Sequence, residues 1–356
     1  TDGKCTAVDT LSAAQLGEAF TDGDGIPALA WESSVCGDEP VRPSYTEKTE
    51  LSAQLAAYIR AAVASARKQG GIEGSLLGNE KYLSGVSSTA TDWMALAMGR
   101  FGYRSNGTYS YMIDDGDGYA AYLAAMRAYI EKAYADNGGI LHRVKATEWH
   151  RAVVAIAALG GDPTDVGKNH IDLIADGTYA WKTTDSLGKQ GLNGWIFALI
   201  ALDSARFAVA QDAAYPREAM LTALLSGQEQ NGGFGLAAGS TDVDITAMAL
   251  QALAPYRNGT VVYDLSAGRR TTVQQALDRA LQWLSAQQTE NGDFISWGAP
   301  NAESTAQVLI ALCALGIDPK TDARFCKNGV SAADGLRRYR LENGLYAHVL
   351  ENGADY

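Results

Sequence analysis

The sequence is poor in the side chains that most often bind metals or form redox centres. Its 356 residues include only four cysteines and four histidines. The cysteines are Cys5, Cys36, Cys313 and Cys326, and neither they nor the histidines follow the spacing of a zinc site. We therefore expect no bound metal and no other cofactor.

Long apolar runs and an excess of positive charge are missing too. The most apolar stretch, residues 195–202, is too short to cross a bilayer. The chain has 29 Lys and Arg against 41 Asp and Glu, a formal net charge of −12. Such a surface repels phosphate backbones and anionic lipids, so we expect neither nucleic-acid binding nor membrane insertion. Because no signal peptide is visible at Thr1, we expect a mature segment of a secreted or cell-surface protein.

The even number of cysteines indicates disulfides if the protein is extracellular. We expect Cys5 and Cys36 to close a small N-terminal region that has little core of its own. We also expect a bond between Cys313 and Cys326, which would join an apolar helix to the segment after it. The alternative for Cys313 is a buried thiol among alanines.

What the sequence has in abundance is glycine, 38 residues of it, arranged in recurring turns. The turn that begins at Asn231 with Asn-Gly-Gly-Phe has four counterparts. They begin at Gly70, Asn137, Asn291 and Asn343. Asn and Gly both tolerate positive φ, so each turn is expected to end a helix and reverse the chain. Self-similarity at a spacing of roughly 50 to 70 residues is typical of stacked helical units.

Two kinds of helix are expected between these turns. The first kind is apolar on nearly all sides and must be buried; its members are residues 152–159, 196–202, 247–254 and 306–315, with a further start at Thr91. The second kind is amphipathic and charged and includes residues 50–68, 119–135, 218–228, 271–288 and 331–340. The alternation predicts buried helices inside and half-exposed helices outside, in an open solenoid or a closed ring.

The two layers are not expected to be equal in number. We count six outer helices but five clear inner ones, because the sixth inner helix would begin near Tyr356. We therefore expect a further segment or domain to complete the inner layer.

Residues 228–235, with the sequence Gln-Glu-Gln-Asn-Gly-Gly-Phe-Gly, resemble the repeat of the prenyltransferase and squalene-cyclase superfamily. The resemblance covers about residues 46–356 and implies an all-α fold, an α/α toroid of the α6/α6 type. The likeness is greatest to toroid modules of large surface proteins of Gram-positive bacteria. Residues 16–20 and 27–31 resemble the end of the β-rich module that often precedes such toroids. The expected domains are thus an appendage, 1–43, and a toroid, 44–356.

Acidic residues stand at the starts of the apolar helices. They are Asp92, Glu148, Asp242, Asp244 and Glu303. Their aromatic and histidine neighbours are Trp93, Trp149, His150, Trp195 and Trp297. If the apolar helices run parallel, these residues would surround one acidic mouth with aromatic walls, which suits a small molecule or a glycan. The alternative is that each acid only caps its own helix and offsets the helix dipole.

Residues 242–249, Asp-Val-Asp-Ile-Thr-Ala-Met-Ala, resemble the acid motif of class II terpene cyclases and a segment of the transcobalamin-type carriers. The cyclase resemblance implies that Asp244 matches the general acid and Asp242 the first acid of the motif. A general acid must stay protonated, which requires burial. The cyclase pattern has another Asp where this chain has Ile245, so a polar partner is missing. The carrier resemblance implies a corrinoid ligand.

These observations favour a ligand-binding module that performs no catalysis. The alternative is an enzyme that uses the carboxylates of Asp242 and Asp244, either a terpene cyclase-like protein or a polysaccharide lyase or hydrolase. Two smaller expectations concern loops. Asp114, Asp115 and Asp117 lack the spacing of an EF-hand and are expected to cap a helix near Tyr119. Residues 257–270 are expected to form a short β-excursion.

Overall fold

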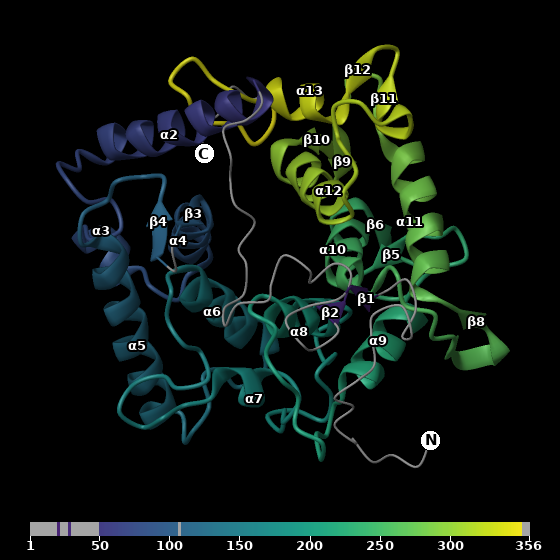
Figure 1. Cartoon of the computed structure of the whole chain (residues 1–356), viewed down its shortest axis with the longest axis horizontal. Coiled ribbons are helices and arrows are strands. Elements are labelled where there is room, and N and C mark those ends of the chain that lie inside the picture. Colours follow the sequence, from purple (N-terminus) through teal and green to yellow (C-terminus); the bar gives the residue numbers. More distant parts are fainter. Residues whose placement is uncertain (1–19, 22–27, 30–49, 106–107, 351–356) are drawn as a thin grey trace. The chain divides into compact units, whose positions relative to one another are not determined.

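The structure, a computed structural model, describes residues 20–21, 28–29, 50–105 and 108–350 (Figure 1). The chain is about half helical, and its strands form short two-stranded sheets. The fold is therefore mostly helical rather than all helical as expected. It divides into two compact units, Thr1–Tyr45 with Gly102–Ser110 and Thr46–Phe101 with Tyr111–Tyr356.

The first unit is described only at its strands. β1 (Phe20–Thr21) pairs antiparallel with β2 (Ala28–Leu29). β3 (Gly102–Ser105) pairs with β4 (Thr108–Tyr111), whose last residue belongs to the second unit. Cys5, Cys36 and the disulfide expected between them lie outside the described residues.

The second unit contains the two predicted kinds of helix. The apolar set consists of α4 (Thr89–Arg100), α6 (Ala146–Ala158), α8 (Asn193–Asp203), α10 (Val243–Leu253) and α12 (Ala302–Ala314). The amphipathic set consists of α2 (Glu50–Gly70), α5 (Gly118–Asp136), α7 (Leu173–Gly177), α9 (Arg217–Ser226), α11 (Val273–Gln287) and α13 (Ala332–Arg337). The short α3 (Glu80–Ser84) follows α2.

Packing follows the predicted layers. Each member of the apolar set contacts the next one along the chain, from α4 through α6, α8 and α10 to α12. The amphipathic helices α5, α7, α9, α11 and α13 each contact at least one member of the apolar set. On α11 the buried residues recur every three or four positions, as expected for a helix with one buried and one solvent-exposed face. The two kinds of helix that alternate along the sequence thus have different neighbours: the apolar helices contact one another, and these amphipathic helices pack against them.

The Asn-Gly turns are built as predicted and make one recurring contact. Gly232, Gly292 and Gly344 all have positive φ, between 86° and 95°. A Cβ on Gly232 would lie 2.7 Å from a carbonyl oxygen of α11, and one on Gly292 would lie 2.3 Å from that of Ser331 beside α13. A Cβ on Gly344 would lie 3.1 Å from Ala61 of α2. These three turns therefore pack closely on an amphipathic helix or its start, the last of them on α2 (Figure 1). In the two earlier turns, a Cβ on Gly71, Gly138 or Gly139 would meet nothing within 4 Å.

Side chains at equivalent positions before these turns make similar contacts. The buried Gln228 donates to the carbonyl of Gly232 in its own turn and to that of Ala276 on α11, both at 2.8 Å. Gln288 makes the matching pair of bonds one repeat later, at 3.1 and 3.0 Å. Arg340 takes the corresponding position in the last turn, and its guanidinium carbon lies 4.4 Å from the centroid of the Tyr58 ring on α2. The contact with α2 thus joins residues that are far apart in sequence.

Short hairpins precede several helices of the second unit. β5 (Phe234–Gly235) and β6 (Thr241–Asp242) lead into α10, and β9 (Phe294–Ser296) and β10 (Ala299–Asn301) lead into α12. The other pairs are β11 (Cys326–Lys327) with β12 (Val330–Ser331) and β7 (Tyr263–Asp264) with β8 (Arg270–Thr271). The β7–β8 pair confirms the excursion predicted within residues 257–270. Short 3-10 turns occupy Ala254–Tyr256, Ser266–Gly268 and Ala323–Phe325.

Two expectations about Cys313 are wrong. Cys313 and Cys326 are free thiols, so the disulfide expected between them is absent. Cys313 is exposed on α12 and is not a buried thiol either, because the C-terminal part of this helix has an uncovered side. None of the helices in the described part of the chain is both long and apolar enough to span a bilayer.

Candidate functional site

The acids predicted to form one mouth lie in two clusters. The first acidic cluster consists of Asp92 and Glu148, which share Arg151. The second acidic cluster consists of Asp242, Asp244 and Glu303, at the starts of α10 and α12. The two clusters differ in how fully their carboxylates are hydrogen-bonded.

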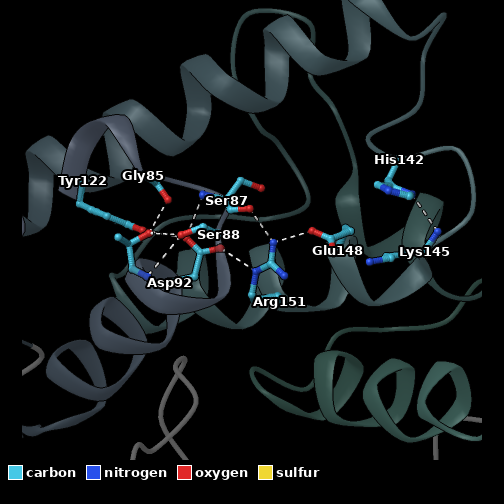
Figure 2. A network of polar contacts seen from close by, with 10 residues as sticks. Gly85, Ser87, Ser88, Asp92, Tyr122, His142, Lys145, Glu148 and Arg151 are labelled. Carbon is cyan, nitrogen blue, oxygen red and sulfur yellow. Dashed lines mark hydrogen bonds and ion pairs between the residues drawn. The ribbon is translucent and has the colours of Figure 1, made fainter. Parts of the chain in front are cut away.

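Every acid of the first cluster has a strong donor (Figure 2). Asp92 is fully buried and accepts from Arg151 Nε at 2.9 Å, from the Tyr122 hydroxyl at 2.7 Å and from the backbone N–H of Ser87 at 3.0 Å. Arg151 also donates to Glu148 at 2.5 Å and to the carbonyl of Ser87 at 2.7 Å. The network joins α4, α5 and α6, so its acids stabilise packing between helices.

Trp149 and His150 belong to the core around α6. Trp149 is 1% exposed; its indole N–H donates to the Tyr134 hydroxyl at 2.7 Å, and its ring meets that of Trp181 edge-on at 5.2 Å. His150 is fully buried, with Nε2 2.7 Å from the carbonyl oxygen of Gly177. Burial lowers the pKa of His150 to about 4, so this imidazole is neutral at pH 7. Both side chains therefore fasten α6 to its neighbours.

The other three predicted tryptophans lie in separate surroundings. Trp93 is 40% exposed and its ring centroid lies 6.5 Å from that of Phe197. Trp195 is half-buried and meets Tyr215 edge-on at 5.5 Å. Trp297 stands at the turn between β9 and β10 and is 93% exposed. Of the five predicted aromatic and histidine residues, only Trp297 lies within a few residues of the second acidic cluster in the chain.

Asp242 in the second cluster is a helix cap. Its Oδ1 accepts from the backbone N–H groups of Asp244 and Ile245 at 2.9 and 3.1 Å, which satisfies donors that the first turn of α10 would otherwise leave unpaired. Its Oδ2 accepts from the Ser296 hydroxyl at 2.6 Å. Asp242 thus ties the β9–β10 hairpin to the start of α10.

Glu303 does not cap its helix. Asn301 does so instead, because its side-chain oxygen accepts from the backbone N–H of Ser304 at 2.8 Å. The exposed Glu303 lies 2.7 Å from Nδ1 of His348, a residue of the C-terminal segment. Sequence reasoning missed Asn301, although an Asn directly before an apolar helix is itself a capping signal.

Asp244 is the one acid of the second cluster whose buried oxygen is unsatisfied. Its Oδ1 is buried and has no hydrogen-bond partner, and the same is true of the Ser304 hydroxyl on α12. Burial raises the pKa of Asp244, whereas the hydroxyl of Ser304, nearby but outside hydrogen-bonding geometry, lowers it; the negative charge of Asp242 raises it. Buried polar atoms are usually paired. Among the described residues seven buried side-chain atoms have no partner, and these two lie on helices that contact each other.

A surface pocket of about 370 Å³ lies near the start of α8 and the end of α9. Its lining includes Leu192, Leu236, Gln228 and Arg269. Arg269 donates to the carbonyls of Ser226 and Gln228, each at 2.9 Å, so its charge is already engaged. No sequence pattern had pointed to this pocket.

The acids at 114–117 act differently from the expected capping. Asp117 precedes α5 but makes no capping hydrogen bond with its side chain. Asp115 is buried and accepts from the backbone N–H groups of Leu76 and Leu77 at 2.6 and 2.9 Å and from Arg67 at 2.6 Å. Its carboxylate is satisfied by donors distant in sequence, which local reasoning could not identify.

Among residues 50–105 and 108–350, no group of three or more His, Cys, Asp or Glu side chains is arranged to hold a metal ion. No protein-family model matches the chain, and no curated protein or solved structure gives a significant match.

Proposed function

We propose that the second unit is an α/α toroid that binds a small molecule or a glycan at the starts of α10 and α12 and catalyses no reaction. The recurring glycine contact supports the ring. Gly232 and Gly292 pack on the next amphipathic helix, and Gly344 packs in the same manner on α2. These three contacts are alike, and the last of them brings the C-terminal turn onto α2, as a closed arrangement requires.

The ends of the apolar set support a missing sixth inner helix. In α6, α8 and α10 every residue is at least partly buried. In contrast, α4 exposes Trp93 at 40% and α12 exposes Ile310 at 51%, together with Cys313. Apolar helices that lack a covering neighbour expose such residues, so we propose that a further segment or domain packs between α12 and α4.

Cys313 offers a direct test of that proposal. In the present chain its exposed thiol should react measurably with a maleimide reagent, at a rate slowed because burial and the charge of Asp318 raise its pKa. When the covering segment is supplied, as a longer chain or a separate domain, the reaction should slow markedly, whereas Cys326 on β11 serves as the reference. If Cys313 reacts at the same rate in the presence and absence of each added segment, the proposal is wrong.

Binding at the second acidic cluster is carried by one observation, the unpartnered Oδ1 of Asp244 beside the unpartnered hydroxyl of Ser304. These atoms offer an acceptor and a group that both donates and accepts. The surrounding carboxylates of Asp242 and Glu303 repel anions. The fitting ligand is therefore neutral or cationic and carries hydroxyl, amine or amide groups, a description met by a glycan or by the amide-bearing rim of a corrinoid.

An extracellular place, secreted or on a cell surface, is proposed from the resemblance to surface toroid modules of Gram-positive bacteria. The net charge of −12 agrees with it only weakly, because an acidic surface suits many compartments. The two free thiols of Cys313 and Cys326 do not add support for an oxidising compartment.

A catalytic function is the second candidate, and one observation favours it. Burial raises the pKa of Asp244, which favours the protonated form that a general acid requires. Two features weigh against it. Asp242 is engaged as a helix cap, and Ile245, a buried apolar residue, stands where the cyclase motif has a third acid.

Native mass spectrometry of the protein from its own host tests the proposal, followed by the variants Asp244→Asn and Ser304→Ala. We expect a retained small molecule that both variants lose, with no product formed. Glu342→Gln, at an exposed acid of the last turn, should keep the ligand. Product formation that Asp244→Asn abolishes would instead establish an enzyme, and retention of the ligand by both site variants would place its binding elsewhere.

A further inference from the structure

The turn between β9 and β10 has a residue that folding does not explain. Ser296 pairs with Ala299, so Trp297 and Gly298 form a two-residue hairpin turn. Both have positive φ, 53° and 95°, as in a type I′ turn. A bulky side chain is costly in this conformation, and Trp297 is also 93% exposed.

A matched turn elsewhere in the chain shows what folding alone selects. In the β11–β12 hairpin, Lys327 pairs with Val330 and the turn residues are Asn328 and Gly329, with φ of 50° and 80°. Asn-Gly is the preferred pair for this turn because Asn tolerates positive φ. Trp297 therefore stands where Asn would be less strained, and its exposed indole contributes no burial in return.

The hairpin that carries Trp297 is fastened to the second acidic cluster. Ser296, its neighbour in the chain, is buried and donates to Asp242 at 2.6 Å. The same hydroxyl lies close enough to Asp244 to lower its pKa. Ile295 is 46% exposed on the hairpin. The exposed ring of Trp297 thus stands at the tip of a short hairpin whose Ser296 is fastened to the cap of α10.

We propose that Trp297 is a stacking platform for a neutral pyranose of an oligosaccharide, whose hydroxyls bind the exposed carboxylate of Glu303; this rests on the proposed binding function of that cluster. A pyranose with equatorial hydroxyls has apolar C–H faces, which fit an indole face, and an edge of donors, which fit carboxylates. The acidic surroundings disfavour uronic-acid and phosphate polymers. Cello- and chito-oligosaccharides have the required shape and charge.

The test uses cellohexaose and chitohexaose as probes, with binding followed by isothermal calorimetry and by tryptophan fluorescence. We expect at least one probe to bind, and Trp297→Asn to weaken that binding about tenfold or more. Because Asn suits the turn, the variant should keep or raise the melting temperature, which separates a binding role from a structural one. Trp297→Phe should restore part of the affinity.

Two controls use matched positions. Asn328→Trp places an exposed tryptophan in the equivalent turn of β11–β12 and should lower stability without adding an oligosaccharide site. Tyr129→Ala removes an exposed aromatic side chain from α5, 43% exposed, and should leave binding unchanged.

Three results would overturn the inference: neither probe binds, Trp297→Asn binds as tightly as the unaltered chain, or Trp297→Asn unfolds the protein. If no oligosaccharide binds but a host molecule is retained through Asp244 and Ser304, the glycan inference fails while the proposed function stands. If oligosaccharides bind through Trp297 and the Asp244 and Ser304 variants bind equally well, the proposed site fails instead. Self-association that Trp297→Asn abolishes would assign this ring to a protein contact.

Discussion

Asp92 and Asp244 begin from the same sequence pattern, an acid in the first turn of an apolar helix, and reach opposite electrostatic states. Asp92 is fully buried and receives three donors, one of them from Arg151. Asp244 is partly buried beside Asp242 and Glu303, and its Oδ1 has no donor. The neighbouring helix decides the difference. α6 supplies an arginine to the first cluster, whereas α12 supplies a serine and a further acid to the second.

The comparison teaches how to separate structural acids from binding acids. A buried carboxylate with a paired guanidinium is already compensated and has little to offer a ligand. A carboxylate surrounded by acids and hydroxyls is uncompensated, so a ligand that donates to it gains the most. The following predictions test whether the two clusters really differ in this way.

The largest effect is expected at the first cluster. Asp92→Ala leaves the guanidinium of Arg151 buried with one carboxylate fewer, and should lower the free energy of unfolding by about 3–5 kcal/mol. Urea unfolding of the variant and the unaltered chain measures it. The control is Asp136→Ala, which removes an exposed i,i+4 pair with Lys132 and should cost under about 0.5 kcal/mol. Equal losses in the two variants would contradict the structural role of Asp92.

The free energy of unfolding should depend on pH because of His150, the residue directly before Arg151. Its pKa is lowered from 6.5 in the unfolded chain to about 4 in the fold, so the unfolded state binds the proton first as pH falls. Stability from this group is complete above about pH 6.5 and decreases as pH falls to about 4. One pKa unit is worth about 1.4 kcal/mol, which makes the loss on the order of 3 kcal/mol.

Urea unfolding at pH 7, 5.5 and 4 measures that loss. His150→Gln, which cannot ionise, should show a flatter dependence over the same interval. An unchanged slope in this variant would mean that other groups cause the acid sensitivity.

The helices and turns were predictable because their causes are local. Positive φ at Gly232, Gly292 and Gly344 follows from the residue type, and the apolar runs directly require burial. The five-residue α7 is too short for periodicity to reveal its bounds. The contact of the last turn with α2 pairs residues over 270 positions apart, roughly the chain length of the whole unit, and no local rule specifies it.

The site was harder to predict because its deciding contacts are non-local. Asp242 as a cap follows from its position before the helix. The pairing of Asp92 with Arg151 spans 59 residues and leaves no local pattern. The burial of Trp149 and His150 did have a signal. They begin a helix predicted to be apolar on all sides, and placing them at an open mouth conflicted with that prediction.

A smaller loss of stability is expected when the caps of α10 and α4 are removed. Asp242→Ala removes a charged cap with bonds of 2.9 and 3.1 Å as well as the tie to Ser296, and should destabilise by about 1–2 kcal/mol. Ser88→Ala removes the cap of α4, whose bond to the N–H of Thr91 is 3.5 Å, and should cost less. Thermal unfolding ranks the two. A larger loss for Ser88→Ala would show that the β9–β10 hairpin does not depend on Asp242.

The smallest expected effect is a rise in melting temperature for Asp244→Asn. Its sign is opposite to that of the other variants, so it distinguishes the two clusters most directly. The folded pKa of Asp244 is raised by burial, so its favourable contribution exists below the unfolded pKa and disappears as pH rises through the folded value. At pH 7 the charged form of Asp244 destabilises the fold. Asp244→Asn should therefore raise the melting temperature, whereas Asp92→Ala lowers it. The gain should shrink as pH falls toward 4, because the carboxyl is then neutral as well. A lower melting temperature at pH 7 would mean that Asp244, like Asp92, is held by a counter-charge, and the second cluster would lose its claim to a ligand.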